Sequence, residues 1–170
     1  MVETVEQAKL MVKAVRYPPE GIRGVGAALA RATHWNSIPD YYAQAHEQIC
    51  LLIQIESVQG LSNLDEILQI EGIDGVFIGA VDLSATMGYQ GDPNHPEVQK
   101  AVIAAIKKIR AAGKAAGILS TTDEVTQKYV ELGTEFVAVG VDTSVLMNGL
   151  RSLLSKYKQL NEVVKAQGGY

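Results

Sequence analysis

The chain of 170 residues has a single cysteine, Cys50, so it can form neither an internal disulfide nor a CxxC metal or redox motif. No apolar run approaches the ~18 residues that a membrane-spanning helix needs, and residues 1–6 lack the basic and apolar regions of a signal peptide. With 15 basic and 19 acidic residues, the net charge of −4 argues against a nucleic-acid or anionic-membrane surface. These absences predict a cytoplasmic protein, with Cys50 buried as a small residue at the start of a strand.

Several catalytic signatures are missing as well. The three histidines, His34, His46 and His95, are scattered, and no HExxH or HxH pair exists. No Ser-His-Asp arrangement is suggested. The glycine-rich stretch 21–26 fits neither GxGxxG nor the P-loop, and no strand precedes it, so we predict a structural loop. We expect the histidines to be surface or capping residues rather than metal ligands or bases.

Four short apolar segments alternate with helical patterns along the chain. The apolar segments cover 51–55, 76–78, 115–119 and 136–141. Helical spacing or capping residues mark 5–15, 39–45, 63–69, 96–113, 121–133 and a last stretch from Thr143 past Tyr157. This alternation predicts βαβ units and a parallel sheet, because a parallel strand covered on both faces is almost wholly apolar.

Four strands and about six helices are compatible with two architectures. The first is a free-standing, doubly wound sheet of four strands. The second is half of an eight-stranded barrel, which normally takes about 250 residues. Because the first recognisable element is a helix with almost no strand before it, we expect a chain that begins partway through a fold.

Two of the apolar segments end in a carboxylate, Glu56 after the first and Asp82 after the second. Parallel strands share a direction, so both side chains should emerge at the end of the sheet where α/β enzymes place their chemistry. Two bare carboxylates ~4 Å apart would repel by ~4 kcal/mol at an effective dielectric constant of about 20. A shared proton, an arginine such as Arg16 or Arg23, or a divalent cation would offset that repulsion, and a small set of oxygen ligands suits Mg²⁺ or Mn²⁺. Two unrelated, solvated carboxylates are the remaining alternative.

The turn after the second segment is a further candidate for ligand binding. Gly79 removes a side chain where the backbone has to approach a ligand. Asp82 then begins a turn or helix whose free N–H groups can hold a carboxylate. A tight strand-to-helix turn with no ligand explains the same residues equally well.

Longer motifs run through nearly the whole chain. They are RYPPEGIRGVG (16–26), ALARA (28–32), QIE (54–56), EGIDGVFIG (71–79), DLS (82–84), MGY (87–89), HPEVQ (95–99) and FVAVGVD (136–142). In this order they resemble the class II pyruvate-dependent aldolases. That family includes 4-hydroxy-2-oxoheptanedioate aldolase and the 2-keto-3-deoxy sugar acid aldolases.

The resemblance implies a (β/α)₈ barrel, usually assembled into hexamers, so we expect a homo-oligomer. It implies that Glu56 and Asp82 are the two carboxylate ligands of a divalent cation, Mg²⁺ or Mn²⁺, with Co²⁺ as a further candidate. The amides of Val81 and Asp82, in the turn that Gly79 opens, would take the pyruvate carboxylate. Leu119 would line the aldehyde side.

The chain departs from the family pattern in two ways. The family reads Gly-Pro-Ala-Asp-Leu-Ser where this chain has Gly79 to Ser84 as GAVDLS, so a larger Val81 lies beside the expected carboxylate site. The family's acid–base histidine and its supporting arginine have no counterpart, and His34 is not in the histidine motif. We therefore expect residues 1–170 to form one partial barrel domain, strands five to eight with their helices, with the catalytic histidine and arginine outside it.

The expected function is divalent-metal-dependent retro-aldol cleavage of 4-hydroxy-2-keto acids to pyruvate and an aldehyde, a chemistry that needs no lysine Schiff base. Whether the chain is active alone stays open. The alternatives are a CoA-ester lyase of the citrate-lyase β type and a non-catalytic, truncated assembly subunit. A small-molecule substrate is expected, and neither a nucleic acid nor a membrane.

Overall fold

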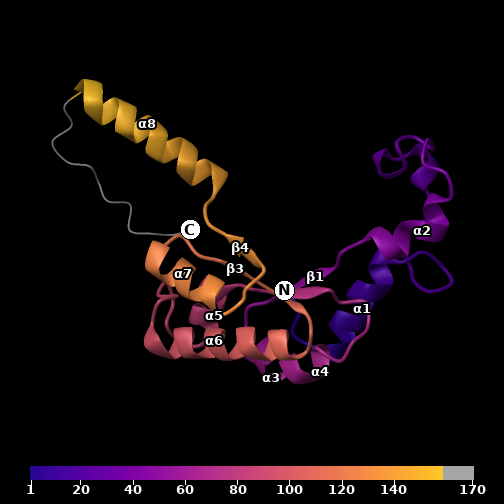
Figure 1. The fold of residues 1–170 in the computed structure, drawn as a ribbon, viewed down its shortest axis with the longest axis horizontal. Coiled ribbons are helices and arrows are strands. Elements are labelled where there is room, and N and C mark those ends of the chain that lie inside the picture. Colours follow the sequence, from indigo (N-terminus) through magenta and orange to yellow (C-terminus); the bar gives the residue numbers. More distant parts are fainter. Residues whose placement is uncertain (159–170) are drawn as a thin grey trace.

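A parallel sheet of four strands forms the centre of the protein, and the computed structural model describes residues 1–158 around it (Figure 1). The predicted domain limit at residue 170 thus lies outside the described residues. The strands are β1 (Leu52–Ile55), β2 (Gly75–Ile78), β3 (Ala115–Leu119) and β4 (Phe136–Ala138). All neighbouring strands are parallel, as the alternating apolar segments predict.

The order of the strands decides between the two predicted architectures. It follows the sequence, β1-β2-β3-β4, so every crossover advances in the same direction around the sheet. A doubly wound sheet reverses its order at a switch point, whereas an arc of a (β/α) barrel does not. Ile55 pairs with Ile78 and Ile78 with Ile118, so these strands end at one common rim. The α/β fold class and the barrel interpretation are confirmed, and the assignment to barrel strands five to eight stays a prediction.

Eight α-helices and two 3₁₀ turns connect and cover the strands within residues 1–158. The helices are α1 (Val5–Val15), α2 (Tyr41–Gln48), α3 (Val58–Ser62), α4 (Leu64–Ile67), α5 (Ala80–Thr86), α6 (Pro96–Ala111), α7 (Asp123–Glu131) and α8 (Asp142–Lys158). The 3₁₀ turns are Ala27–Leu29 and Arg31–Thr33. The helix predicted at 63–69 begins earlier and is divided into α3 and α4, and the last strand ends at Ala138 rather than at residue 141.

Helix starts follow the capping signals in two of three cases. Thr4 and Gln7 form the predicted capping box, in which the Gln7 N–H donates to Thr4 Oγ1 at 3.2 Å. His95 accepts from the Glu97 N–H at 3.3 Å and so caps α6, as a capping histidine should. The box predicted at Thr121 is wrong, because the N-cap of α7 is the next residue, Thr122, and its side chain makes no capping hydrogen bond.

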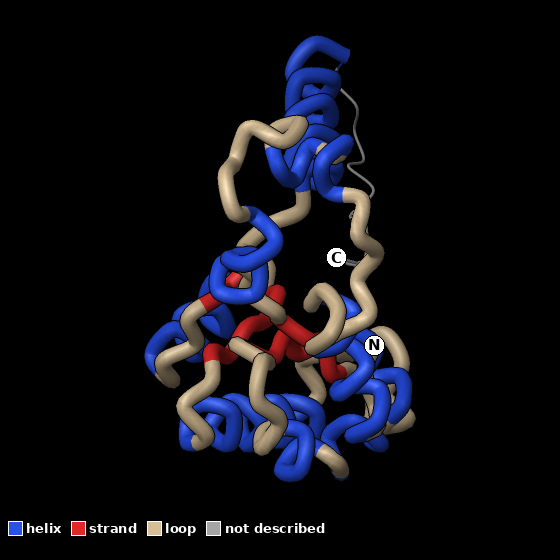
Figure 2. The backbone as a smooth tube through the Cα atoms, turned by 90° about the vertical axis from the view of Figure 1, so that its right-hand side faces the viewer, coloured by secondary structure: helices blue, strands red, loops and turns tan. Residues whose placement is uncertain are grey.

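The helices cover one face of the sheet (Figure 2). Helix α6 packs on β2 and β3, α7 packs on β4, and α1 packs on α4. Alternate strand residues point into this layer and are at most 3% exposed: Ile53, Ile55, Val76, Ile78 and Ile118. On the other face Leu52 is 39% and Phe136 51% exposed. Within the described residues the expectation that both faces are covered therefore holds for one face only, because an apolar run does not say what covers it.

Two parts extend from this layered body in Figure 1: the segment 16–48 and α8. The segment exposes Leu29 and Trp35, the latter at 70%. Tyr41 and Tyr42 of α2 pack on Tyr17, with ring centroids 6.4 and 4.9 Å away.

The prediction that Cys50 is buried is also wrong. Cys50 is exposed, because β1 begins only at Leu52 and the cysteine lies in the connection before it. None of the helices described in residues 1–158 has the length and apolar character to span a membrane. The cytoplasmic location stays a prediction.

Candidate functional site

The candidate site lies at the rim where β1 and β2 end. Glu56 follows β1 directly, and Asp82 is the third residue of α5, which begins right after β2. A Cβ atom built on Gly79 would lie 2.3 Å from Glu56 Oε2, which is closer than real atoms approach. Gly79 thus makes room for the Glu56 carboxylate. From the sequence we expect a ligand next to the Gly79 backbone, and in this structure the group next to it is the Glu56 side chain.

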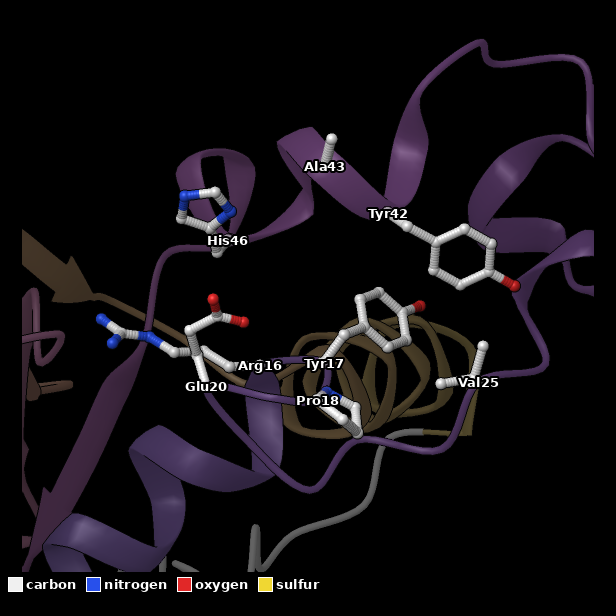
Figure 3. Close-up of a pocket in the computed structure, with 8 residues that line it drawn as sticks. All are labelled: Arg16, Tyr17, Pro18, Glu20, Val25, Tyr42, Ala43 and His46. Carbon is white, nitrogen blue, oxygen red and sulfur yellow. The ribbon is translucent and has the colours of Figure 1, made fainter.

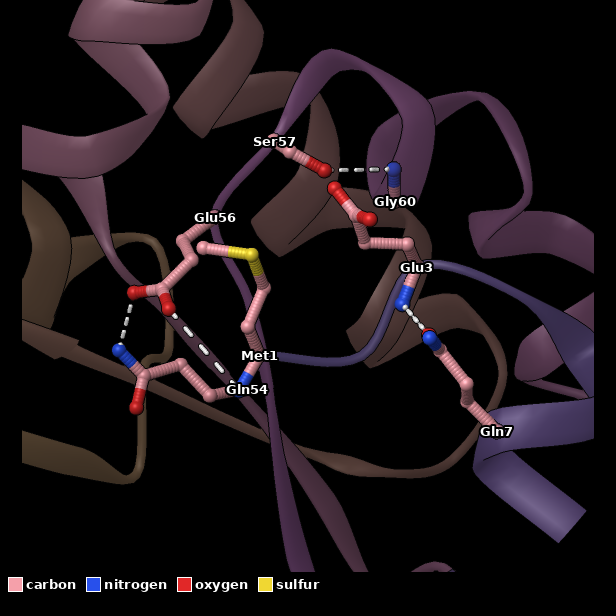
Figure 4. A network of polar contacts seen from close by, with 7 residues as sticks. All are labelled: Met1, Glu3, Gln7, Gln54, Glu56, Ser57 and Gly60. Atoms are coloured by element: carbon pink, nitrogen blue, oxygen red, sulfur yellow. Dashed lines mark hydrogen bonds and ion pairs between the residues drawn. The ribbon is translucent and has the colours of Figure 1, made fainter. Parts of the chain in front are cut away.

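Glu56 is a buried carboxylate, 7% exposed. The Gln54 amide donates a hydrogen bond to Glu56 Oε2, and the Met1 ammonium nitrogen lies 3.9 Å from Oε1 (Figure 4). Among the ion pairs of the described residues, neither Arg16 nor Arg23 reaches it. The Glu56 oxygens thus have one hydrogen-bond donor and one ammonium group near them, and carboxylate oxygens of this kind are ligands that a divalent cation accepts.

Gln54 is a site residue that the sequence analysis missed. It interrupts an otherwise apolar strand two positions before Glu56, and residues two apart in a strand share a face. That pattern was the signal available in the sequence: a polar side chain on the same face as the carboxylate that ends the strand.

Asp82 lies in the first turn of α5 and is exposed. Its carboxylate has no hydrogen bond or ion pair within residues 1–158. The first helical hydrogen bond of α5 is donated by the Leu83 N–H, which lies 2.9 Å from Gly79 O. The N–H groups of Val81 and Asp82 precede it and have no acceptor within the helix. The start of α5 therefore offers free donors beside a free carboxylate.

Leu119 ends β3 at the same rim. Since Ala116 and Ile118 point into the helical layer, strand alternation turns Leu119 to the opposite face, which Gln54 and Glu56 share. The structure thus places an apolar side chain on the same open face as the polar pair. The register of β1, β2 and β3 decides this placement.

The histidines have other environments. His46 Nε2 lies 3.8 Å from Glu47 on α2, and His34 ends a 3₁₀ turn in the left-handed conformation. His95 caps α6 while its ring stacks on Tyr89, with centroids 3.7 Å apart. These placements agree with the expectation of surface or capping histidines.

The chemistry of the rim is that of a small set of oxygen ligands. No cluster of three or more His, Cys, Asp or Glu residues suited to a metal occurs in the described part of the chain. Glu56 and Asp82 are two carboxylates, which leaves the other coordination positions of a cation to water and substrate. That division fits Mg²⁺ or Mn²⁺, which keep several waters and few protein ligands.

Comparison with known proteins gives concordant results. A sequence model of the HpcH/HpaI aldolase/citrate lyase family matches residues 1–149. A hydroxypyruvate/pyruvate aldolase of Pseudomonas aeruginosa is 59% identical over 158 residues, covering 93% of this chain and 59% of that protein. A 4-hydroxy-2-oxo-heptane-1,7-dioate aldolase of Salmonella paratyphi B is 53% identical over 170 residues, covering 100% and 65%.

Solved structures agree in fold. The crystal structure of an HpcH/HpaI aldolase/citrate lyase family protein from Burkholderia cenocepacia superposes with a TM-score of 0.85 at 31% identity, covering 93% of this chain and 63% of that one. The HpcH/HpaI aldolase of Desulfitobacterium hafniense superposes with a TM-score of 0.81 at 25% identity. This chain therefore spans 59 to 65% of the length of the curated relatives described above.

Proposed function

This chain belongs to the HpcH/HpaI aldolase/citrate lyase family, and from that premise we propose that it carries the cation-holding and pyruvate-binding rim of a retro-aldol lyase. The reaction cleaves a 4-hydroxy-2-keto acid to pyruvate and an aldehyde. One observation carries the proposal: the Glu56 carboxylate is buried against Gly79 at the rim where α5 begins, with Asp82 in the first turn of that helix. The names of the relatives supply the reaction class, and the activity of this chain is part of the proposal.

Glu56 and Asp82 would hold the divalent cation, Mg²⁺ or Mn²⁺, with Co²⁺ as a further candidate. The fit rests on the oxygen donor set, on the burial of Glu56 and on the absence of a partner for Asp82 within residues 1–158. When bound, the cation supplies Lewis acidity toward the carboxylate and keto oxygens of the substrate. Gln54 would keep Glu56 in place by holding one of its oxygens.

The start of α5 would bind the pyruvate part of the substrate. The Val81 and Asp82 N–H groups donate to its carboxylate, and the partial positive charge of a helix start favours the anion. Gly79 lets Glu56 approach that turn closely. Leu119, on the same open face, would line the aldehyde side. The acid–base histidine and arginine of the family have no counterpart in this sequence, so we assign binding and orientation to these residues and no proton transfer.

Manganese titration followed by electron paramagnetic resonance tests the cation site. We expect Glu56→Gln and Asp82→Asn each to weaken Mn²⁺ binding at least tenfold, since each removes one charged ligand. Asp65→Asn is the matched control, because Asp65 is an exposed carboxylate paired with Lys108 at 2.6 Å. Equal Mn²⁺ binding by the parent chain and a variant with both carboxylates neutralised would contradict the proposal.

Product assays separate the three functions considered. Pyruvate release from 4-hydroxy-2-ketoheptanedioate in the presence of Mn²⁺ supports the lyase, and cleavage of malyl-CoA or citramalyl-CoA instead supports a CoA-ester lyase. A chain that joins a full-length aldolase but releases no pyruvate itself is an assembly subunit. The 52 to 59% identity to curated aldolases favours the first outcome.

We also propose that the chain forms a homo-oligomer through α8. None of the residues described in α8 is buried. Its exposed apolar side chains include a stripe at helical spacing: Leu146, Leu150, Leu153 and Tyr157, each more than half exposed. A stripe of this kind on a helix that stands clear of the body is typical of an interface, and a second copy of the same helix supplies a matching apolar stripe (Figure 1).

A further inference from the structure

A second site lies away from the rim, in a hollow of about 330 Å³ between the end of α1, the loop that follows it and α2 (Figure 3). Arg16, one of its lining residues, contacts Gly72, which precedes β2. The hollow is therefore near the edge where the strands begin, whereas Glu56 and Asp82 are at the edge where they end. Neither of those two carboxylates lines it.

Arg16 is held in place by packing alone. A Cβ atom on Gly72 would lie 2.4 Å from Arg16 Nη2 and 2.9 Å from a methyl group of Val12, so the guanidinium rests on the bare glycine. Within residues 1–158 the Arg16 guanidinium makes no hydrogen bond and no ion pair. Its nitrogen atoms are not among the fully buried ones that lack a partner, so they are reached by solvent. The positive charge is thus positioned by its neighbours and open to solvent.

Glu20 brings the opposite charge to the same hollow. Its carboxylate has no hydrogen bond or ion pair to any residue in 1–158, Arg16 included. Figure 3 shows the Glu20 carboxylate and the His46 imidazole facing one space, with Arg16 at the same end of the hollow. Two opposite charges that line one hollow without pairing leave room for a ligand that bears both.

The other end of the hollow is aromatic and rigid. The Tyr17 and Tyr42 rings meet edge to face, with centroids 4.9 Å apart. The Arg23 guanidinium lies 4.6 Å from the Tyr17 ring centroid and donates from Nη2 to the Tyr41 hydroxyl at 3.3 Å, which fixes the position of Tyr17. Val25 completes this wall. Rigid rings offer apolar contact area at a small cost in conformational entropy.

We propose that this hollow binds a free α-amino acid with an apolar side chain. Arg16 takes the carboxylate, Glu20 takes the ammonium group, and the side chain lies against Tyr17, Tyr42 and Val25. At about 330 Å³ the space is at the small end of metabolite pockets, which suits one amino acid. A simple 2-keto acid fits less well, because it leaves Glu20 unpaired beside a second carboxylate.

Isothermal titration with L-leucine and L-phenylalanine tests the proposal on the chain without added metal. We expect a single site with a dissociation constant between roughly 1 µM and 1 mM, the range in which proteins hold metabolites. Two leucine analogues, 4-methylpentanoate without the ammonium group and 3-methylbutylamine without the carboxylate, should each bind at least tenfold more weakly. The proposal would be overturned if either analogue bound as tightly as leucine, or if neither leucine nor phenylalanine bound.

Variants locate the site and separate it from the rim. Glu20→Gln and Arg16→Gln should each weaken leucine binding at least tenfold, while Glu6→Gln and Lys9→Gln on the exposed side of α1 leave it unchanged. Thermal melting shows whether each variant is folded. Glu56→Gln should keep full leucine binding, so failure of the lyase proposal does not affect this one. Unchanged leucine binding by a folded Glu20→Gln variant refutes the site.

Discussion

At the scale of single residues, the difference between the two ends of the sheet is in their polar partners. Beside the starts of the strands, two charged side chains are satisfied by the backbone: Asp74 Oδ2 accepts from the Leu51 N–H at 2.6 Å, and Lys114 Nζ donates to Ile73 O at 2.7 Å. Where the strands end, Asp82 has no partner in residues 1–158 and Glu56 has few. Unused polar capacity at the carboxyl ends of strands is what a catalytic or binding rim requires.

Gly79→Ala tests how closely the rim is packed. The new methyl group would lie 2.3 Å from Glu56 Oε2 and 2.7 Å from Glu56 Cβ, so the carboxylate has to move. We expect a loss of about 1 to 3 kcal/mol in the free energy of unfolding, from overpacking, and Mn²⁺ binding weakened at least tenfold. Urea unfolding and manganese titration measure the two effects.

The control for that change is Gly24→Ala. No atom lies within 4 Å of a Cβ built at Gly24, so Mn²⁺ binding should match that of the parent chain and the free energy of unfolding should not fall. If Gly79→Ala also left Mn²⁺ binding unaltered, Glu56 would not be the ligand that we propose.

At the scale of elements, α6 and α7 are the helices that pack directly on strands β2, β3 and β4. Helix α6 buries Val98, Val102, Ile106 and Ile109, each at 0% exposure. Tyr129 of α7 is 1% exposed, and its hydroxyl donates to Gln99 Oε1 of α6 at 3.0 Å. Gln99 in turn donates from Nε2 to Pro93 O at 2.9 Å. This chain of bonds joins both helices to the turn that precedes α6.

Tyr129→Phe should reveal this bond through the pH dependence of stability. Burial raises the pKa of Tyr129 above its ordinary value near 10.0. The folded protein therefore holds the Tyr129 proton more tightly than the unfolded chain, so stability is complete below about pH 10 and declines as the pH rises further. At pH 7 the variant should lose about 1 kcal/mol with the hydrogen bond. Above pH 10 it should lose less additional stability than the parent chain.

Urea unfolding at pH 7 and at about pH 10.5 measures both effects. Tyr157→Phe is the matched control, since Tyr157 is 77% exposed on α8. Parallel losses by the parent chain and Tyr129→Phe above pH 10 would show that Tyr129 ionises equally easily in both states.

At the scale of the whole molecule, the described chain is an arc of a barrel with one covered face. The helical layer buries one side of the strands, while Leu52, Phe136 and the stripe on α8 stay exposed. Exposed apolar area of this extent marks an interaction surface. The proposed homo-oligomer follows from that surface.

Leu146→Glu combined with Leu153→Glu should disrupt assembly. Two carboxylates in the apolar stripe of α8 oppose its burial against a second copy, because burying a charge without a partner is costly. Sedimentation velocity should show a smaller particle than the parent chain forms. Since both residues are more than half exposed, the stability of the protomer should change by less than about 0.5 kcal/mol.

Asn148→Glu is the control for assembly. It adds one charge to the opposite side of α8, and the sedimentation coefficient should stay that of the parent chain. A parent chain that sediments as a monomer at all concentrations would contradict assembly through α8.

The sequence by itself determined the parallel α/β class, the position of most strands and helices, and the family. Apolar runs such as 115–119 and capping residues such as Thr4 are local signals, and local chemistry decides them. It also singled out Glu56 and Asp82, because a carboxylate that soon follows a buried strand stands out against apolar neighbours.

Only the tertiary structure decided the rest. Strand order separated the barrel arc from the doubly wound sheet, since both have the same succession of elements. The exposure of Cys50 and Trp35 depends on which segments cover them, and the hollow beside Arg16 and Glu20 exists only because α2 meets the end of α1. The physical reason is that burial and pairing are properties of contacts between segments, and local periodicity does not specify which segments meet.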